Sequence, residues 1–257
     1  MANELLLIVS LLAAAFAPPL IYMYIVRNTE TCRREPWSAM ILAFIYGGTV
    51  AVFISIFLES LAQLILYNDY SPLARGFWNF EPYDLVLQTL IMACIVAPIV
   101  EESAKASVVP RRRIVELEDG FIYGAAVGLG FAASENLLYL VSALSNSVEA
   151  FVLTAVVRAV TSTLLHASAS AIAGFGIALA IFMRSQGGMP KWLPYLGLAM
   201  LLHGLFNLFA SLGDLVPIDQ TSFALLGLGL GFVLAAGTFI MIRRRIKALD
   251  SRERCPV

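Results

Sequence analysis

Seven long apolar stretches constrain the fold of this chain more than any other feature of its sequence. A transmembrane helix needs about 20 mostly apolar residues to cross the ~30 Å hydrocarbon core of a bilayer. The stretches cover residues 5–26, 37–67, 85–109, 120–144, 151–183, 192–212 and 221–242. Of the 257 residues, 14% are charged, against about 25% in soluble domains. The sequence therefore predicts an all-α polytopic membrane protein of the cell membrane: a bundle of about seven transmembrane helices, with residues 1–257 forming a single transmembrane domain.

Basic residues between these stretches predict how the chain crosses the membrane. Arginine and lysine are frequent in the first, third and fifth connections and after residue 242, and scarce elsewhere. The residues concerned are Arg27, Arg33, Arg34, Arg111, Arg112, Arg113, Arg184, Lys191, Arg243, Arg244, Arg245, Lys247, Arg252 and Arg254. Because cytoplasmic connections carry an excess of Lys and Arg, we expect the N-terminus outside and a short basic cytoplasmic tail at 243–257. Residues 1–4 lack the basic residues of a secretory signal, so we expect the first stretch to be retained.

Two adjacent carboxylates, Glu101 and Glu102, lie inside the third apolar stretch. A charged side chain near the bilayer centre costs at least ~2.5–3.5 kcal/mol on insertion scales, so such residues indicate functional sites. Lys105 follows Glu101 by four residues, which is the spacing of an intrahelical ion pair. Neighbouring carboxylates resist ionising together, so one can pair with Lys105 while the other acts as a general base. The alternative is a cluster of ions at the cytoplasmic end of the helix.

The next two stretches carry a third glutamate and the first of the two histidines. Glu135 and Asn136 lie in the fourth stretch, where Tyr139 shares a helix face with Glu135. In the fifth stretch polar residues recur every four positions, at Thr154, Arg158, Ser162, His166 and Ser170. Such a stripe must face protein or water. Its arginine is placed to neutralise a glutamate across the bundle.

The sixth stretch adds the second histidine, His203, with Asn207 four residues later, so that both side chains aim at one point. A glutamate can polarise water while a histidine or an asparagine stabilises an oxyanion. Equally, Glu135, His166 and His203 match a zinc site with one position open for water. The chain contains neither His-Glu-x-x-His nor Gly-x-Ser-x-Gly, so a standard zincin or a serine-hydrolase elbow is not expected.

Two further patterns concern helix packing. Gly120, Gly124 and Gly128 recur at four-residue spacing, which lets helix backbones approach closely, so we expect the fourth helix to be buried against its neighbours. Pro98 is expected to kink the third helix just before Glu101. Counting along the helices places Glu135 deeper in the membrane than Glu101. A separation of more than two turns would exclude a single site.

These motifs resemble the PrsW family of intramembrane proteases. The resemblance covers about residues 85–211 and rests, in order, on Glu101-Glu102-x-x-Lys105, Phe131-x-x-x-Glu135-Asn136 with Tyr139, Arg158 with His166, and His203-x-x-x-Asn207. The family is similar in turn to CAAX prenyl endopeptidases and bacteriocin-processing membrane enzymes. Such relatives are classed sometimes as metalloproteases and sometimes as metal-free, glutamate-dependent enzymes. Within the family, cleavage of a membrane-bound anti-sigma factor is known.

The resemblance implies a membrane-embedded endopeptidase with its catalytic core at about 85–212, either metal-free or using Zn²⁺. Its expected partners are the lipid bilayer and a membrane-protein or lipidated-peptide substrate. A net charge of −1 argues against nucleic acid. The expected catalytic residues are Glu101, Glu102, Glu135, His166, His203 and Asn207, supported by Lys105, Asn136, Tyr139 and Arg158. Glu101 or Glu102 would activate water, and His203 with Asn207 would stabilise the oxyanion.

Two other classes of function fit the same residues. Chains of Glu, His and Arg also build the proton relays of transporters, which would show a through-going polar path and broken helices in a repeated arrangement. A non-catalytic membrane scaffold of the same fold would tolerate the loss of Glu102 or His203.

Overall fold

The computed structural model describes residues 2–67, 85–185 and 192–250, and within these ranges the chain is helical without β-strands. Seven of the described helical spans are long and apolar enough to cross a membrane. They are Leu5–Arg27, Trp37–Leu66, Val86–Val108, Leu117–Asn146, Val148–Met183, Trp192–Ala210 and Gln220–Asp250. The predicted all-α bundle of about seven spans is confirmed. The direction of insertion and the single-domain assignment stay predictions, and residues 251–257 of the basic tail lie outside the described part.

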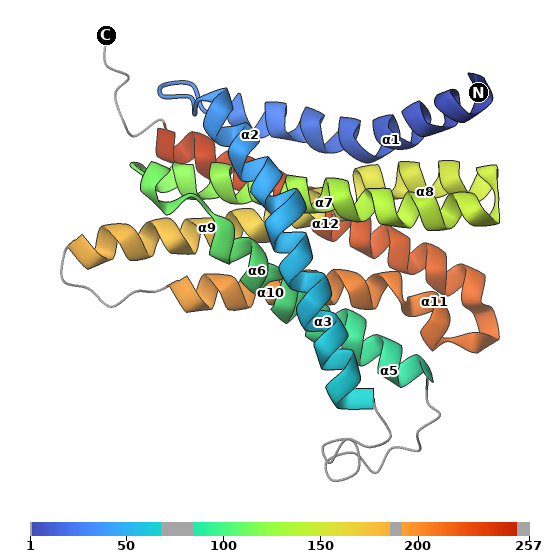
Figure 1. The fold of residues 1–257 in the computed structure, drawn as a ribbon. Coiled ribbons are helices and arrows are strands. Elements are labelled where there is room, and N and C mark those ends of the chain that lie inside the picture. The colour runs from blue at the N-terminus through green and yellow to red at the C-terminus, as the bar shows by residue number, and fades with distance from the viewer. Residues whose placement is uncertain (1, 68–84, 186–191, 251–257) are drawn as a thin grey trace.

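The first two spans are α1 (Ala2–Arg27) and a long helix made of α2 (Trp37–Tyr46), the π-helical turn η1 (Gly47–Ala51) and α3 (Val52–Tyr67). Gly47 and Gly130 allow this long helix to cross α7 (Leu117–Asn146) in backbone contact. A Cβ on Gly47 would overlap the carbonyl oxygen of Val127, and one on Gly130 would overlap that of Phe44. The crossing holds α3 across the middle of the bundle (Figure 1).

The third span consists of α5 (Leu85–Ile91), the π-helical turn η2 (Met92–Val96) and α6 (Ala97–Val108), followed by the short η3 (Arg111–Arg113). Pro98 has no N–H to donate and so cannot continue regular α-helical hydrogen bonding. The helix departs from α geometry directly before this proline, at the position where the sequence predicts a kink. Glu101, Glu102 and Lys105 therefore lie on the segment that follows the distortion.

The core lies between α7 (Leu117–Asn146) and α9 (Ser162–Ser185). A Cβ on Gly120, Gly124 or Gly128 would overlap the backbone oxygen of Gly174, Ser170 or His166 respectively. The predicted close approach of the fourth helix to a neighbour is thus confirmed. Ile122, Tyr123, Leu129 and Leu165 of these two helices are among the most buried large side chains.

The fifth span is not one continuous helix. Between α7 and α9 the chain forms α8 (Val148–Val160), which packs beside α7 (Figure 1). The helix is interrupted at Thr161, whose φ and ψ are −119° and −81°. The polar stripe from Thr154 to Ser170 is therefore divided between two helices. Arg158 and His166 therefore lie on opposite sides of the break.

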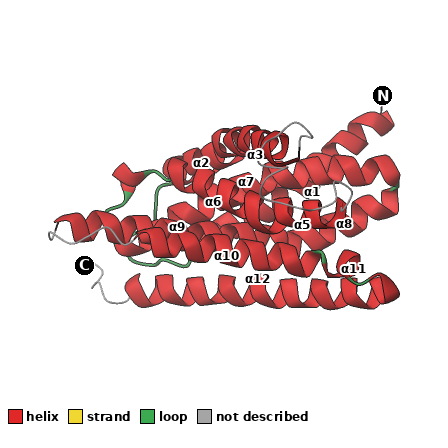
Figure 2. Ribbon diagram, turned by 90° about the horizontal axis from the view of Figure 1, so that it is seen from below, coloured by secondary structure: helices red, strands yellow, loops and turns green. Residues whose placement is uncertain are grey.

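The remaining elements are α10 (Trp192–Ala210), the short α11 (Leu212–Leu215) and η4 (Pro217–Asp219), and α12 (Gln220–Asp250). Figure 2 shows α12 along one side of the bundle, where it packs on α9 and α10. The C-terminal ends of α1, α9 and α12 and the start of α7 lie at one end of the molecule (Figure 1). This shared end carries the arginines of the first and third connections, as the alternation of basic connections predicts.

Candidate functional site

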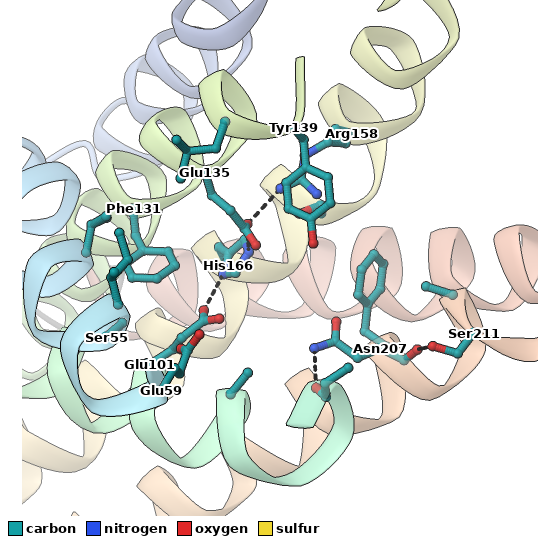
Figure 3. Close-up of a pocket in the computed structure, with 18 residues that line it drawn as sticks. Ser55, Glu59, Glu101, Phe131, Glu135, Tyr139, Arg158, His166, Asn207 and Ser211 are labelled. Carbon is teal, nitrogen blue, oxygen red and sulfur yellow. Dashed lines mark hydrogen bonds and ion pairs between the residues drawn. The ribbon is translucent and has the colours of Figure 1, made fainter. Parts of the chain in front are cut away.

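Five helices bring the predicted site residues together around one cavity of about 430 Å³ (Figure 3). The polar residues lining it include Glu101 from α6, Glu135 and Tyr139 from α7, Arg158 from α8, His166 from α9 and Asn207 from α10. Glu102 and His203 lie behind this lining and are buried. The segments come from across the 85–211 region, so the cavity is a product of the tertiary fold.

Lys105 organises the two adjacent carboxylates of α6. Its Nζ lies 2.6 Å from Glu102 Oε1 and 3.2 Å from Glu101 Oε2, in accord with the predicted pair with Glu101. The side chain of Lys105 is fully buried and its ammonium lies 4.2 Å from the ring centroid of Phe131, a cation–π arrangement. One buried cation thus serves two carboxylates, which offsets part of the cost of burying them.

His203 is held by Glu102. Its Nδ1 lies 3.0 Å from Glu102 Oε1, and the hydroxyl of Ser170 donates to Glu102 Oε2 at 3.3 Å. Glu102 therefore links α6, α9 and α10. A carboxylate bonded to one ring nitrogen fixes the tautomer and orientation of a histidine, so Glu102 sets the position of His203.

His166 is held by Glu135 in the same way. Its Nε2 lies 2.7 Å from Glu135 Oε2, and its Nδ1 lies 3.1 Å from Lys105 Nζ. An ammonium can only donate, so Nδ1 accepts that bond and Nε2 carries the hydrogen donated to Glu135. The two histidine rings meet edge to face with centroids 5.0 Å apart.

Arg158 completes the surroundings of Glu135. Its Nη2 donates to Glu135 Oε2 at 2.7 Å, and its Nε donates to Asn136 Oδ1 at 2.7 Å. The amide of Asn136 donates to Thr163 at 3.1 Å, and the guanidinium lies 4.0 Å from the ring centroid of Tyr139. The predicted neutralisation of a glutamate by Arg158 is confirmed. These contacts tie the start of α9 to α7 across the break at Thr161.

Asn207 lines the cavity but does not share a partner with His203. Its Nδ2 donates to the carbonyl oxygen of Ala93 at 2.7 Å (Figure 3). Ala93 belongs to the π-helical turn before Pro98, and π turns are frequent at functional sites. This bond fixes the amide of Asn207 against the distorted part of the third span.

The carboxylate closest to both histidines is Glu101. Its Oε2 lies 4.0 Å from His166 Nδ1 and 3.9 Å from His203 Nδ1. Glu101, His166 and His203 each offer a ligand atom within 4.8 Å of the other two, so in the described part of the chain Glu101 takes the place that the sequence suggested for Glu135. The carboxylate of Glu135 is engaged by Arg158 and by the opposite nitrogen of His166.

This donor set fits a catalytic zinc ion. Two imidazoles and one carboxylate with a fourth position for water are the ligands of such sites. Lys105 approaches Glu101 and His166, but its shortest ion pair is to Glu102, so its charge would still have a partner if Glu101 and His166 held a metal. The expected difference in depth does not place Glu101 and Glu135 in separate sites. His166 contacts both carboxylates: its Nδ1 lies 4.0 Å from Glu101 Oε2, and its Nε2 lies 2.7 Å from Glu135 Oε2.

Sequence reasoning missed the contribution of α3. Ser55 and Glu59 line the same cavity (Figure 3). The Oε1 atom of Glu59 is buried and makes no hydrogen bond within the described residues. Glu59 is an acidic residue inside the apolar stretch 37–67, which is the same signal that identified Glu101.

Comparison with known proteins identifies the family of this chain. Residues 35–242 match the family model described as PrsW family intramembrane metalloprotease. Similar proteins include Protease PrsW of Clostridioides difficile (strain 630), 28% identical over 75% of this chain and 76% of that protein. Protease PrsW of Geobacillus kaustophilus (strain HTA426) is 32% identical over 77% and 78%. Protease PrsW of Bacillus subtilis (strain 168) is 39% identical over 42% and 48%.

No solved structure matches the chain. The family model spans most of its length and every residue of the cavity network. This chain therefore belongs to the PrsW family of intramembrane metalloproteases.

Proposed function

We propose that this protein hydrolyses a peptide bond of a membrane-associated protein in the cavity formed by α3, α6, α7, α8, α9 and α10. One observation carries the proposal: the carboxylate of Glu101 faces the cavity 3.9–4.0 Å from both histidines, and each histidine is held by a carboxylate of its own. Groups that are fixed before substrate binds need no rearrangement during the reaction, which is the basis of electrostatic preorganisation.

Glu101 is the proposed general base. It lines the cavity, whereas Glu102 is fully buried behind it. A water molecule in the cavity would give its proton to Glu101 as it attacks the peptide carbonyl, and Glu101 would then pass that proton to the leaving amine. Glu102 acts through His203 as a positioning residue.

Asn207 is the proposed oxyanion donor. Its amide nitrogen carries two hydrogens, and only one is used in the bond to Ala93. The other can reach a carbonyl oxygen held in the cavity. His203, which lies between Glu102 and Glu101, is proposed to stabilise the oxyanion together with Asn207.

In a metal-dependent form of the reaction, Glu101 would be a ligand instead of the base, and the ion would be held by Glu101, His166 and His203, the group whose ligand atoms lie within 4.8 Å of one another. A zinc ion so bound lowers the pKa of water and polarises a carbonyl group. Glu102 and Glu135 then orient the two histidines from the second layer.

The substrate path is proposed to run between α3 and the third span. A second cavity of about 330 Å³ lies there, and it shares Glu59, Ala93 and Ala97 with the first. Its lining includes Gln63, Gln88 and Thr89. An unwound peptide needs hydrogen-bonding partners inside a membrane, and the side-chain amide of Gln63 contains both a donor and an acceptor.

The test is cleavage by the purified protein in liposomes, using a panel of single-span peptides and lipidated peptides. Wild type is compared with Glu101→Gln and His203→Ala, and with Glu149→Gln, which changes an exposed carboxylate in the first turn of α8. We expect cleavage by wild type and Glu149→Gln, and none by the two site variants. The zinc content of each preparation, measured alongside, should fall with His203→Ala if catalysis uses a metal. Full cleavage by folded Glu101→Gln and His203→Ala would refute the proposed site.

A further inference from the structure

A second group of carboxylates lies away from the cavity, at the end of the bundle that carries the arginine-rich connections. The connection between α1 and α2 meets the start of α7 and the last turn of α12 there (Figure 1). The acidic residues of these three segments are Glu30, Glu35, Glu116, Glu118, Asp119 and Asp250. All except Glu116 are buried. Nothing in the proposed hydrolysis uses these residues.

Glu30 is the member that needs an explanation. It is 0% exposed. Neither of its carboxylate oxygens makes a hydrogen bond of normal geometry to the described residues, and the backbone amide of Glu35 is a nearby donor that favours its ionised form. The nearby arginines have other partners: Arg34 donates to the backbone oxygen of Glu30, Arg33 pairs with Glu116, and Arg243 donates to Thr29. A buried carboxylate without a partner is strongly unfavourable unless it is protonated or binds a cation.

The neighbouring carboxylates are placed to share a cation with Glu30. Oxygen atoms of Glu30, Glu118 and Asp250 lie within 4.8 Å of one another, and so do those of Glu30, Glu116 and Asp119. Glu30 belongs to both sets. All the donors are carboxylate oxygens, the ligands that hard cations such as Mg²⁺ and Ca²⁺ prefer, whereas zinc and copper sites contain nitrogen or sulfur ligands.

Backbone groups hold two of these carboxylates in place. Asp250 accepts from the amides of Thr31 and Cys32 at 3.0 Å each. Asp119 accepts from the amides of Val115 and Glu116 at 2.7 and 2.8 Å. The positions of the Asp250 and Asp119 carboxylates are thus set by backbone amides of the α1–α2 connection and of the start of α7. A preformed set of ligands loses less entropy on binding.

We propose that this acidic cluster binds one hard divalent cation, Mg²⁺ or Ca²⁺, through Glu30, Glu118 and Asp250. The ion ties the α1–α2 connection to α7 and α12. Mutual repulsion adds support, because the charges of Asp119, Glu35 and Asp250 lie close enough to Glu30 to disfavour its ionised form. A divalent cation would offset that repulsion and keep Glu30 ionised.

The test uses Mn²⁺ as a paramagnetic probe on the full-length protein in detergent after treatment with EDTA. We expect wild type to bind one Mn²⁺ that millimolar Mg²⁺ or Ca²⁺ displaces. Glu30→Gln, which keeps the shape of the side chain, should weaken this binding at least tenfold, and so should Asp250→Asn. Glu149→Gln is the matched control. His203→Ala should keep the displaceable Mn²⁺, which separates this site from the histidine site.

A thermal-unfolding series distinguishes a bound cation from a protonated Glu30. With a cation site, Mg²⁺ raises the Tm of wild type but not that of Glu30→Gln, and in EDTA the variant is at least as stable as wild type. If Glu30 is only a buried neutral acid, Mg²⁺ leaves the Tm of wild type unchanged and no displaceable Mn²⁺ is found. Either of those two results in wild type overturns the proposal.

Discussion

Glu101 and Glu102 are neighbours in the chain, yet successive side chains on a helix point about 100° apart, and the two have different surroundings. Glu101 faces the cavity between the histidines, whereas Glu102 is enclosed by Lys105, Ser170 and His203. Replacing them therefore tests two different roles. One residue is proposed to contact the reacting water, and the other to hold a histidine.

We expect Glu101→Gln to lower kcat by about 100-fold or more, since general-base catalysis contributes about 10²–10⁴. Glu102→Gln should lower kcat by about 10–100-fold, as loss of the partner of a histidine does. Measuring kcat and KM for both variants checks this. Equal losses of kcat in the two variants would contradict the division of roles.

Replacing Arg158 is also expected to change the stability of the protein. Its side chain and that of Glu135 are 13% and 22% exposed, so the pair is largely shielded from water. Arg158→Met should lower the free energy of unfolding by about 1–3 kcal/mol, because a charged hydrogen-bonded group loses its partner. The double variant with Glu135→Gln should recover part of that loss. Additive effects in this double-mutant cycle, measured by chemical unfolding in detergent, would show that the two groups are not coupled.

The sequence identifies the residues of the cavity better than it identifies their pairing. Ionisable side chains in apolar stretches are costly, and that cost singles out Glu101, Glu135 and His166 without any structure. Which carboxylate approaches which histidine depends on side-chain direction and helix crossing, so the place between the histidines goes to Glu101 and not to Glu135. Glu59 carries the same signal and was overlooked because it stands alone in its helix.

At the scale of helices, the contact of α7 with α9 positions the site. Gly128 lies directly against the carbonyl oxygen of His166. We expect Gly128→Ala to push the helices apart, lower the free energy of unfolding by about 1–3 kcal/mol and reduce activity, because His166 moves with its backbone. Thermal unfolding and cleavage rates are the measurements.

Gly229→Ala supplies the control for that substitution. Gly229 lies in α12, and a Cβ there meets no atom within 4 Å. The alanine should be neutral or stabilise by about 0.5–1 kcal/mol through helix propensity. Equal destabilisation by both substitutions would show that the α7–α9 contact has no special role.

Sequence patterns predict these helices but not their interruptions. Four-residue glycine spacing and Pro98 are local signals, and the structure contains the close contact and the distortion that they indicate. The break at Thr161 has no comparable signal, since the residue at the break is neither a proline nor a glycine. Contacts of Arg158 with Glu135 and Asn136 accompany this break, and such contacts are visible only once the helices are packed.

For the whole molecule, polar groups are concentrated in two places. One is the cavity inside the bundle, and the other is the acidic cluster at the basic end. Large apolar side chains such as Phe53 on α3 and Leu153 on α8 are 74% and 67% exposed, as expected for helices that face lipid. Hydropathy reveals this division, but the acidic cluster is assembled from three distant segments, so its existence could not be predicted.

The acidic cluster makes the stability of the whole molecule depend on pH. Burial and nearby carboxylates raise the pKa of Glu30 to about 8, and burial with the contact to Asp119 raises that of Glu35 to about 8. The ordinary value for both is 4.5. Because the folded-state values are raised, their contribution to stability is fully present below about pH 4.5 and is lost as pH rises through about 8.

We therefore expect the Tm of EDTA-treated wild type to fall between pH 5 and pH 9, roughly the range between the unfolded and folded pKa values. Glu30→Gln should show a shallower fall, since a glutamine does not ionise, and Glu149→Gln should follow wild type. Added Mg²⁺ should flatten the curve of wild type, because a bound cation stabilises the ionised carboxylates. Parallel curves for wild type and Glu30→Gln in EDTA would mean that Glu30 has an ordinary pKa and that the cluster does not control the stability of the bundle.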